Sequence, residues 1–216
     1  MKIMQCWDDN SRNDIHLVEL FRTYGAKATF NIIIPETDGG YGRDLKYHDF
    51  MVRHLDLSEM KDVYAGFKVA GHGGRHCRSI SSDEFKDEVS SVKQCIAEFF
   101  RQPECGYAYP GGGYNKQTKQ ILQQTGYKYA RTTLNVDLRL PLEEPFELPS
   151  HCHFMADDFW LKYHHIKDMN DIFYFWGHSY ELMNDEKLWK RIETILEHIA
   201  NDKNVEWIDI IDLFAG

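Results

Sequence analysis

The fold is decided by residues 1–35, which read MKIMQCWDDNSRNDIHLVELFRTYGAKATFNIIIP. Lys2 to Trp7 is a short apolar run that stops at a polar segment, as a buried strand does where it enters a loop. Apolar residues at helical spacing follow from Asp14, and Gly25 ends that helix. Ala28 to Pro35 is a second apolar run, rich in isoleucine. Strand, helix and strand within about 34 residues predict a βαβ unit of a parallel α/β fold.

The rest of the chain repeats this alternation of helical and strand patterns. Helices are expected at 57–65, 82–100, 116–124 and 185–200, the second with Ser82 as its N-cap and the third ended by Gly126. Strands are expected at 67–70, 105–109, 127–132 and 171–176, and a proline-punctuated loop at 138–149. No repeat or linker interrupts the series. We therefore expect one α/β domain over residues 1–216, with about six or seven strand–helix units in a barrel or a doubly wound sheet.

Composition excludes some classes of protein. The chain has 216 residues, of which 43% are hydrophobic, enough for a sizeable core, and a net charge of −9. The acidic balance argues against general nucleic-acid binding, and no apolar stretch approaches the ~18 residues of a membrane span. Five cysteines form no C-x-x-C pair and no signal peptide is evident. Reduced thiols and a cytoplasmic location are expected, or an exported one if a signal peptide has been removed.

Chemically useful side chains fall where the expected strands end. In parallel α/β folds the carboxyl ends of the strands meet at the active site. One such group alone, for example the aspartate pair, could equally well belong to the start of a helix. Five strand ends of this kind together indicate a functional site. They carry Asp8 with Asp9, His72 with His76, the Pro-Gly loop after Tyr109, Arg131, and His178.

The segment Gly71-His72-Gly73-Gly74-Arg75-His76 indicates a metal site. If the chain is helical here, the i, i+4 spacing places both imidazoles on one face, with Cβ atoms about 5–6 Å apart. Neutral imidazole suits Zn, Fe, Co or Ni, and a carboxylate is the usual third ligand. The chain has eleven histidines, and some pairs at this spacing arise by chance. The prediction therefore depends on a carboxylate from another strand end.

Four motifs together resemble the polysaccharide deacetylases, carbohydrate esterase family four. They are Cys6-Trp7-Asp8-Asp9-Asn10, His72-x-x-x-His76, Ala108-Tyr109-Pro110-Gly111 and Trp176-Gly177-His178, in the family's order and approximate spacing. The stretch from Asp14 to Phe30 also resembles that family's first helix and second strand, so the resemblance covers nearly the whole chain. It implies a distorted (β/α) barrel with fewer than eight complete units, about seven strands, and a divalent metal held by Asp-His-His.

The resemblance also implies a role for each matching residue. Asp9, His72 and His76 would hold one divalent metal, Zn before Co, Ni, Fe or Mn, and leave positions open for water and substrate. Asp8 would be the base for a metal-bound water, and His178 would protonate the departing amine. The Gly111 N–H would stabilise the oxyanion, and Tyr109, Pro110 and Trp176 would contact the substrate. The expected reaction is removal of N-acetyl, or O-acetyl, groups from an N-acetylhexosamine-containing saccharide.

The sequence departs from the family pattern at several positions. Ala108 stands where the family has an arginine that orients the catalytic aspartate; Arg131 could supply that guanidinium, or form a surface salt bridge instead. The family's Asp-Trp motif has no clear counterpart, and Asp137 is a weak candidate for its aspartate. Asn10 replaces a glycine, and Trp176 replaces a leucine as a wall for the acetyl methyl. The metal triad is intact.

Other readings stay open. The chain could be a catalytically weak relative that binds metal and glycan, or a hydrolase of a non-sugar amide. Retention of Asp8 and His178 favours the enzyme, because a pure binding module needs neither a base nor an acid. His151 and His153 could hold a second metal, line the cleft, or simply pack. Glu181 could hydrogen-bond within the site or favour a helix start. The sequence does not predict the oligomeric state.

Overall fold

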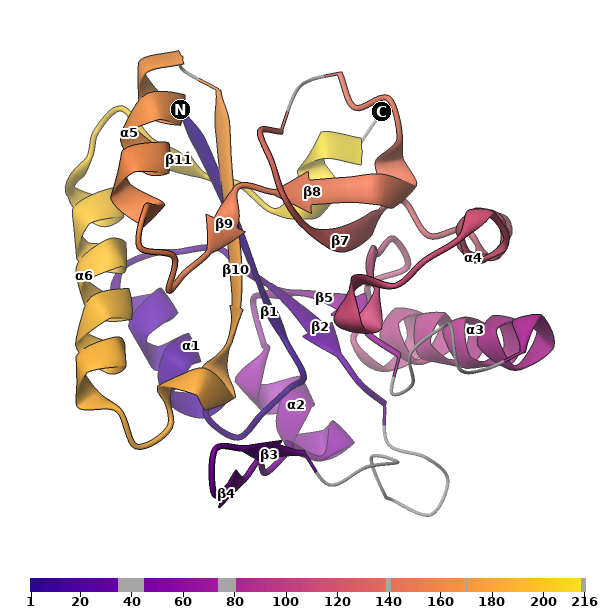
Figure 1. Ribbon diagram of the computed structural model, residues 1–216. Coiled ribbons are helices and arrows are strands. Elements are labelled where there is room, and N and C mark those ends of the chain that lie inside the picture. The colour runs from indigo at the N-terminus through magenta and orange to yellow at the C-terminus, as the bar shows by residue number, and fades with distance from the viewer. Residues whose placement is uncertain (35–44, 74–80, 139–140, 170, 215–216) are drawn as a thin grey trace.

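The computed structural model describes residues 1–34, 45–73, 81–138, 141–169 and 171–214. Nine strands form one parallel sheet in the order β8-β7-β6-β5-β2-β1-β10-β9, with β11 paired to the start of β1 (Figure 1). They are β1 Lys2–Asp8, β2 Thr29–Ile32, β5 Lys68–Gly71, β6 Tyr107–Ala108, β7 Ala130–Asn135, β8 Leu148–Ser150, β9 Cys152–His153, β10 Ile172–His178 and β11 Glu206–Trp207. Strands β3 (Lys46–Tyr47) and β4 (Phe50–Met51) form a separate hairpin.

The two edge strands of the sheet are consecutive in the chain. Only His151 separates β8, which pairs with β7, from β9, which pairs with β10. One extended segment thus pairs with β7 through its first part and with β10 through its last part. It brings these two strands together around a central space. Counting β8 and β9 as one position and leaving aside β11, which pairs only with the start of β1, seven strand positions surround that space. The predicted parallel α/β fold with about seven strands is confirmed, although the expected loop at 138–149 was wrong at its end, where residues 148–150 form β8.

The helices cover the outside of the sheet. They are α1 Asp14–Thr23, α2 Leu57–Val63, α3 Ser82–Phe99, α4 Lys116–Thr125, α5 Phe159–Met169 and α6 Glu186–Asn201. Figure 1 shows α1, α5 and α6 on one side and α3 and α4 on the other. The N-cap of α3 is Ser81, one residue before the predicted Ser82. The Ser81 hydroxyl accepts from the Glu84 N–H, and the Glu84 carboxylate accepts from the Ser81 N–H.

Alternation along β1 separates two cores. Ile3 and Trp7 belong to the large core that also contains Leu17 and Phe21 of α1, so they face the helices. Met4 and Cys6 belong to the smaller core inside the ring of strands. Because side chains alternate along a strand, Asp8 continues the inward-facing column. The same alternation on β10 places His178 in line with Tyr174, another residue of the inner core.

Candidate active site

Asp8 lies at the C-terminal end of β1, buried against two hydrogen-bond donors. The Arg131 guanidinium donates to Asp8 Oδ2, and Asn31 Nδ2 donates to Oδ1 at 2.7 Å. Burial alone would raise the pKa of Asp8. The charges of Arg131, His72 and His178 outweigh burial and hold its pKa below the usual value. Asp8 is therefore an ionised carboxylate at neutral pH, fixed in one orientation.

Arg131 reaches Asp8 across the inside of the ring. Its strand, β7, is separated from β1 by β6, β5 and β2 in the sheet order. The side chain is 1% exposed, and its guanidinium lies 4.8 Å from the centre of the Trp176 ring. The surface salt bridge considered for Arg131 is therefore wrong. Asp137, the weak candidate for a supporting aspartate, is exposed, whereas Arg131 bonds Asp8 directly.

Asp9 faces His72, which lies directly after β5. His72 Nδ1 is 2.9 Å from the carbonyl oxygen of Ala108, so it carries the hydrogen, and Nε2 faces Asp9 Oδ1 at 3.3 Å. Burial lowers the pKa of His72, but Asp8 and Asp9 raise it by more than burial lowers it, so the net shift is upward. An imidazole nitrogen beside a carboxylate oxygen, with the second ring nitrogen held by a backbone carbonyl, is the arrangement that metal-ligating histidines adopt. These two residues fit a divalent metal. His76, the third predicted ligand, lies outside the described residues.

A left-handed turn lets adjacent aspartates serve one site. Asp9 and Asn10 have φ values of 71° and 35°, so the strand ends at Asp8 and the chain turns at once. The Asn10 side chain accepts from the Ile33 N–H at 2.8 Å and lies 3.5 Å from the carbonyl oxygen of Leu55. Asparagine tolerates this backbone conformation better than most residues other than glycine. The departure from glycine at position 10 is thus structurally accommodated.

The Pro-Gly loop after β6 forms a tight turn over Pro110–Gly112, in which Gly111 has φ 61°. Pro110 is buried, and the Tyr109 ring is also buried, stacked on Tyr114 at 5.1 Å. The Tyr109 hydroxyl donates to the carbonyl oxygen of Phe146. Tyr109 was predicted to contact substrate. Its side chain packs in the core, so any such contact would fall to its backbone.

His178, at the end of β10, presents its two ring nitrogens to different partners. Nε2 lies 3.9 Å from Asp8 Oδ2, and Nδ1 lies 3.3 Å from Glu181 Oε1. Burial lowers the pKa of His178, but Glu181 and Asp8 raise it more, so the net shift is upward. Trp176, partly exposed on the same strand, donates its Nε1–H to Asn135. The predicted site residues Asp8, Asp9, His72, Arg131 and His178 are thus brought together.

The histidines at 151 and 153 do not act as a pair. His151 is buried, its ring lies 5.4 Å from Phe173, and its two nitrogens face the backbone N–H groups of Leu138 and Tyr174. The suggestion of a shared metal at His151 and His153 is therefore wrong. His153 instead approaches Glu181. Sequence reasoning also missed Asn31, although it too stands at the end of a strand.

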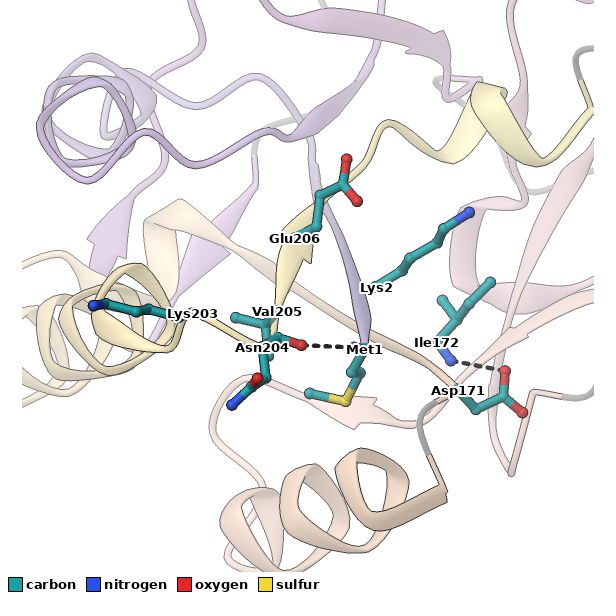
Figure 2. Close-up of a pocket in the computed structure, with 8 residues that line it drawn as sticks. All are labelled: Met1, Lys2, Asp171, Ile172, Lys203, Asn204, Val205 and Glu206. Carbon is teal, nitrogen blue, oxygen red and sulfur yellow. Dashed lines mark hydrogen bonds between the residues drawn. The ribbon is translucent and has the colours of Figure 1, made fainter.

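A hollow at the opposite end of the strands is separate from these residues. Figure 2 shows its lining, which is Met1, Lys2, Asp171, Ile172, Lys203, Asn204, Val205 and Glu206. Lys2 pairs with Ile172 at the start of β1, whereas Asp8 pairs with His178 at its end. The hollow thus faces the N-terminal ends of the strands, the end where parallel barrels do not carry their active sites.

A buried carboxylate beneath the site makes stability depend on pH. Asp14 accepts from the Tyr64 hydroxyl at 2.5 Å, and burial raises its pKa from 3.8 to about 7. The folded state therefore binds this proton more tightly than the unfolded state, and stability falls as pH rises from about 4 to 7. Urea unfolding of wild type should show this fall in the free energy of unfolding, up to about 4 kcal/mol, across that range. In Asp14→Asn the fall due to Asp14 should be absent. Exposed Asp87→Asn should keep the wild-type slope; an unchanged slope in Asp14→Asn would contradict the assignment.

The sequence profile described as polysaccharide deacetylase matches residues 1–130, more than half of the chain. No curated protein sequence matches at a significant level. No helix in the described ranges is long and apolar enough to cross a membrane.

Several solved structures share the fold. The deacetylase PplD of Streptococcus pyogenes, solved with acetate, is 24% identical with a TM-score of 0.57 over 68% of this chain; the match spans 62% of PplD. A polysaccharide deacetylase of Mycobacterium smegmatis, described as putative, is 10% identical with a TM-score of 0.67 over 98% of this chain and 87% of its own. A family 4 carbohydrate esterase of Streptomyces lividans, solved with acetate, is 14% identical with a TM-score of 0.58 over 94% and 90%.

These likenesses concern the fold, whereas the profile match concerns the sequence and covers the motifs at Asp8, His72 and Ala108. The family predicted from the sequence is confirmed, and the predicted enzyme class, a sugar deacetylase among the hydrolases, is the class of that family. The chain belongs to the polysaccharide deacetylase family.

Proposed function

We propose that this protein is a metal-dependent deacetylase that hydrolyses N-acetyl groups, or O-acetyl groups, of an N-acetylhexosamine-containing saccharide. The observation that carries the proposal is the buried Asp8 carboxylate, held by Arg131 and Asn31 beside the imidazole of His178. A binding module would gain nothing from a buried base fixed next to an acid. The family supports deacetylation of a polysaccharide, and two structural relatives were solved with acetate.

Asp8 is proposed as the general base. Arg131 and Asn31 occupy one side of the carboxylate and keep it ionised, so it is ready to accept a proton from the attacking water. Because both donors are fixed by buried contacts, the carboxylate does not have to reorient during the reaction.

Asp9 and His72 are proposed as ligands of a divalent metal, with His76 as the third by resemblance. Zn is the first candidate, because a nitrogen and carboxylate donor set suits it, and Co, Ni, Fe or Mn are alternatives. Such an ion would polarise the acetyl carbonyl and lower the pKa of a bound water. Its identity is part of the proposal.

His178 is proposed as the general acid. Its pKa is raised, which favours the protonated ring, and Glu181 lies beside Nδ1 so that Nε2 faces the Asp8 side. From Nε2 the ring would protonate the departing amine. The Gly111 N–H would stabilise the developing oxyanion, and Trp176 would exclude water around the acetyl methyl.

Metal content and acetate release, measured on the same preparations, test this proposal. Wild type, reconstituted with zinc and dialysed, should retain one more divalent ion per chain than Asp9→Ala, and should release acetate from one or more N-acetylated saccharides of a panel. Asp62→Ala, at an exposed position of α2, is the control and should match wild type in both measurements.

Three results would change the conclusion. If wild type and Asp9→Ala retain equal amounts of every metal tried, the ligand assignment is wrong. If the protein retains metal and hydrolyses a non-sugar amide, but releases no acetate from any saccharide, the substrate is an amide outside the sugars. If the protein retains metal and binds glycan but hydrolyses nothing, it is a relative of the enzymes that only binds.

A further inference from the structure

Three side chains beside Asp8 form a second group of metal-type ligands. His153 lies on β9, His178 ends β10, and Glu181 lies in the 3-10 turn Ser179–Leu182. Strands β9 and β10 are paired, with Trp176 opposite His153, so neighbouring strands hold the two imidazoles. One donor atom from each of the three residues lies within 4.8 Å of the other two.

The donor atoms converge without forming aligned hydrogen bonds. His153 Nε2 is 2.9 Å from Glu181 Oε2, and His178 Nδ1 is 3.3 Å from Glu181 Oε1. Both nitrogens are buried, yet neither makes a hydrogen bond of good geometry with the described part of the chain. The Glu181 carboxylate is fixed from below, because its Oε2 accepts from the His178 backbone N–H at 3.0 Å. Two imidazole nitrogens that face one anchored carboxylate are arranged as ligands around a shared ion would be.

We propose that His153, Glu181 and His178 form a second divalent-metal site, distinct from the one at Asp9 and His72. Two imidazoles and one carboxylate suit Zn²⁺ or Co²⁺, whereas Mg²⁺ and Ca²⁺ prefer all-oxygen ligand sets. The three residues lie in described ranges and provide the donor set of a three-ligand site with open positions. None of them belongs to the first site.

Occupation of this site inhibits the deacetylase, a consequence that rests on the proposed function. His178 contributes Nδ1 to the second site, while Nε2 faces Asp8 at 3.9 Å from Oδ2. A metal bound at Nδ1 occupies the lone pair of that nitrogen. A second proton cannot then bind there to form imidazolium. The ring then keeps only the Nε2–H of a neutral imidazole, which is a far weaker acid than imidazolium and cannot readily protonate a leaving amine. The second ion therefore competes with the acid function of His178.

Cobalt binding tests the site without depending on activity. The variant Asp9→Ala/His72→Ala lacks the first site. We expect it to bind about one Co²⁺ per chain in a calorimetric titration, and the bound Co²⁺ to show visible d–d absorption. Adding His153→Gln should weaken that binding by more than the ~10–100-fold typical of losing an outer-sphere partner. Adding His165→Gln, at an exposed position of α5, should leave it unchanged. Circular dichroism checks that each variant is folded, and Glu181→Gln provides a second ligand variant.

An activity measurement tests the inhibition. Excess Zn²⁺ should suppress acetate release by wild type and by His165→Gln, while His153→Gln keeps its activity at the same zinc concentration. The proposal is overturned if the Asp9→Ala/His72→Ala chain binds no Co²⁺, or binds it equally well after His153→Gln or Glu181→Gln. A wild type that releases no acetate would instead count against the proposed function and leave the cobalt result standing.

Discussion

Replacing Arg131 with methionine is expected to lower the free energy of unfolding by about 3–5 kcal/mol at pH 7, because it leaves the buried Asp8 carboxylate without its cation. Methionine fills much of the space but donates no hydrogen bond. Asn31, with the charges of His72 and His178, then has to compensate a carboxylate that is 3% exposed. Urea unfolding of wild type and Arg131→Met measures the difference.

The loss should depend on pH in a defined direction. The pKa of Asp8 is lowered in the folded state, so the stability that the pair contributes is present above the pKa of an unfolded aspartate, about 3.9, and is lost as pH falls below it. Arg131→Met should therefore cost most near neutral pH and less under acidic conditions.

An exposed ion pair provides the matched control for Arg131. Lys128 and Glu104 approach to 2.9 Å at the surface, with side chains 40% and 59% exposed, and Lys128→Gln should cost less than about 1 kcal/mol. The double variant Arg131→Met/Asp8→Asn should recover most of the lost stability, because neither buried charge then stays unpaired. Equal, small effects for Arg131→Met and Lys128→Gln would show that the buried pair does not contribute as argued.

Local patterns were sufficient for most of the fold. The βαβ unit of residues 1–35 and the later helices other than α5 follow from hydrophobic period and from caps, which act within a few residues. Residues 148 and 149 belong to the loop predicted at 138–149, because prolines punctuate that segment. With Ser150 they form β8 because β7 lies beside them, and Pro149 is tolerated at the edge of the sheet. No local signal reports such a pairing partner.

The site divides in the same way. Asp8, Asp9, His72 and His178 stand at strand ends, a position that a sequence reveals. That Arg131 pairs with Asp8 depends on two strands lying across the ring from each other. The approach of His153 to Glu181 likewise depends on β9 lying beside β10. Partnerships set by tertiary contacts carry no signal in residue spacing.

His178→Gln is expected to reduce acetate release from an N-acetylated saccharide by roughly 10²–10⁴-fold, because glutamine cannot protonate the departing amine. The loss should appear mainly in kcat, and the metal retained at Asp9 and His72 should be unchanged, since His178 is not a ligand of that site. Glutamine can still hydrogen-bond Glu181, so the turn after β10 should keep its conformation.

Comparing substrates with different leaving groups distinguishes a general acid from a residue that only positions the substrate. An aryl acetate releases a phenolate that needs little protonation, so His178→Gln should lose far less of its rate on this ester than on the amide. Asp8→Asn should lose rate on both substrates, because attack by water needs the base in either reaction. Unfolding measurements must accompany Asp8→Asn, which leaves the buried Arg131 unpaired. An equal loss on ester and amide in His178→Gln would assign that ring to positioning, because proton donation to the leaving group is the step in which the two substrates differ.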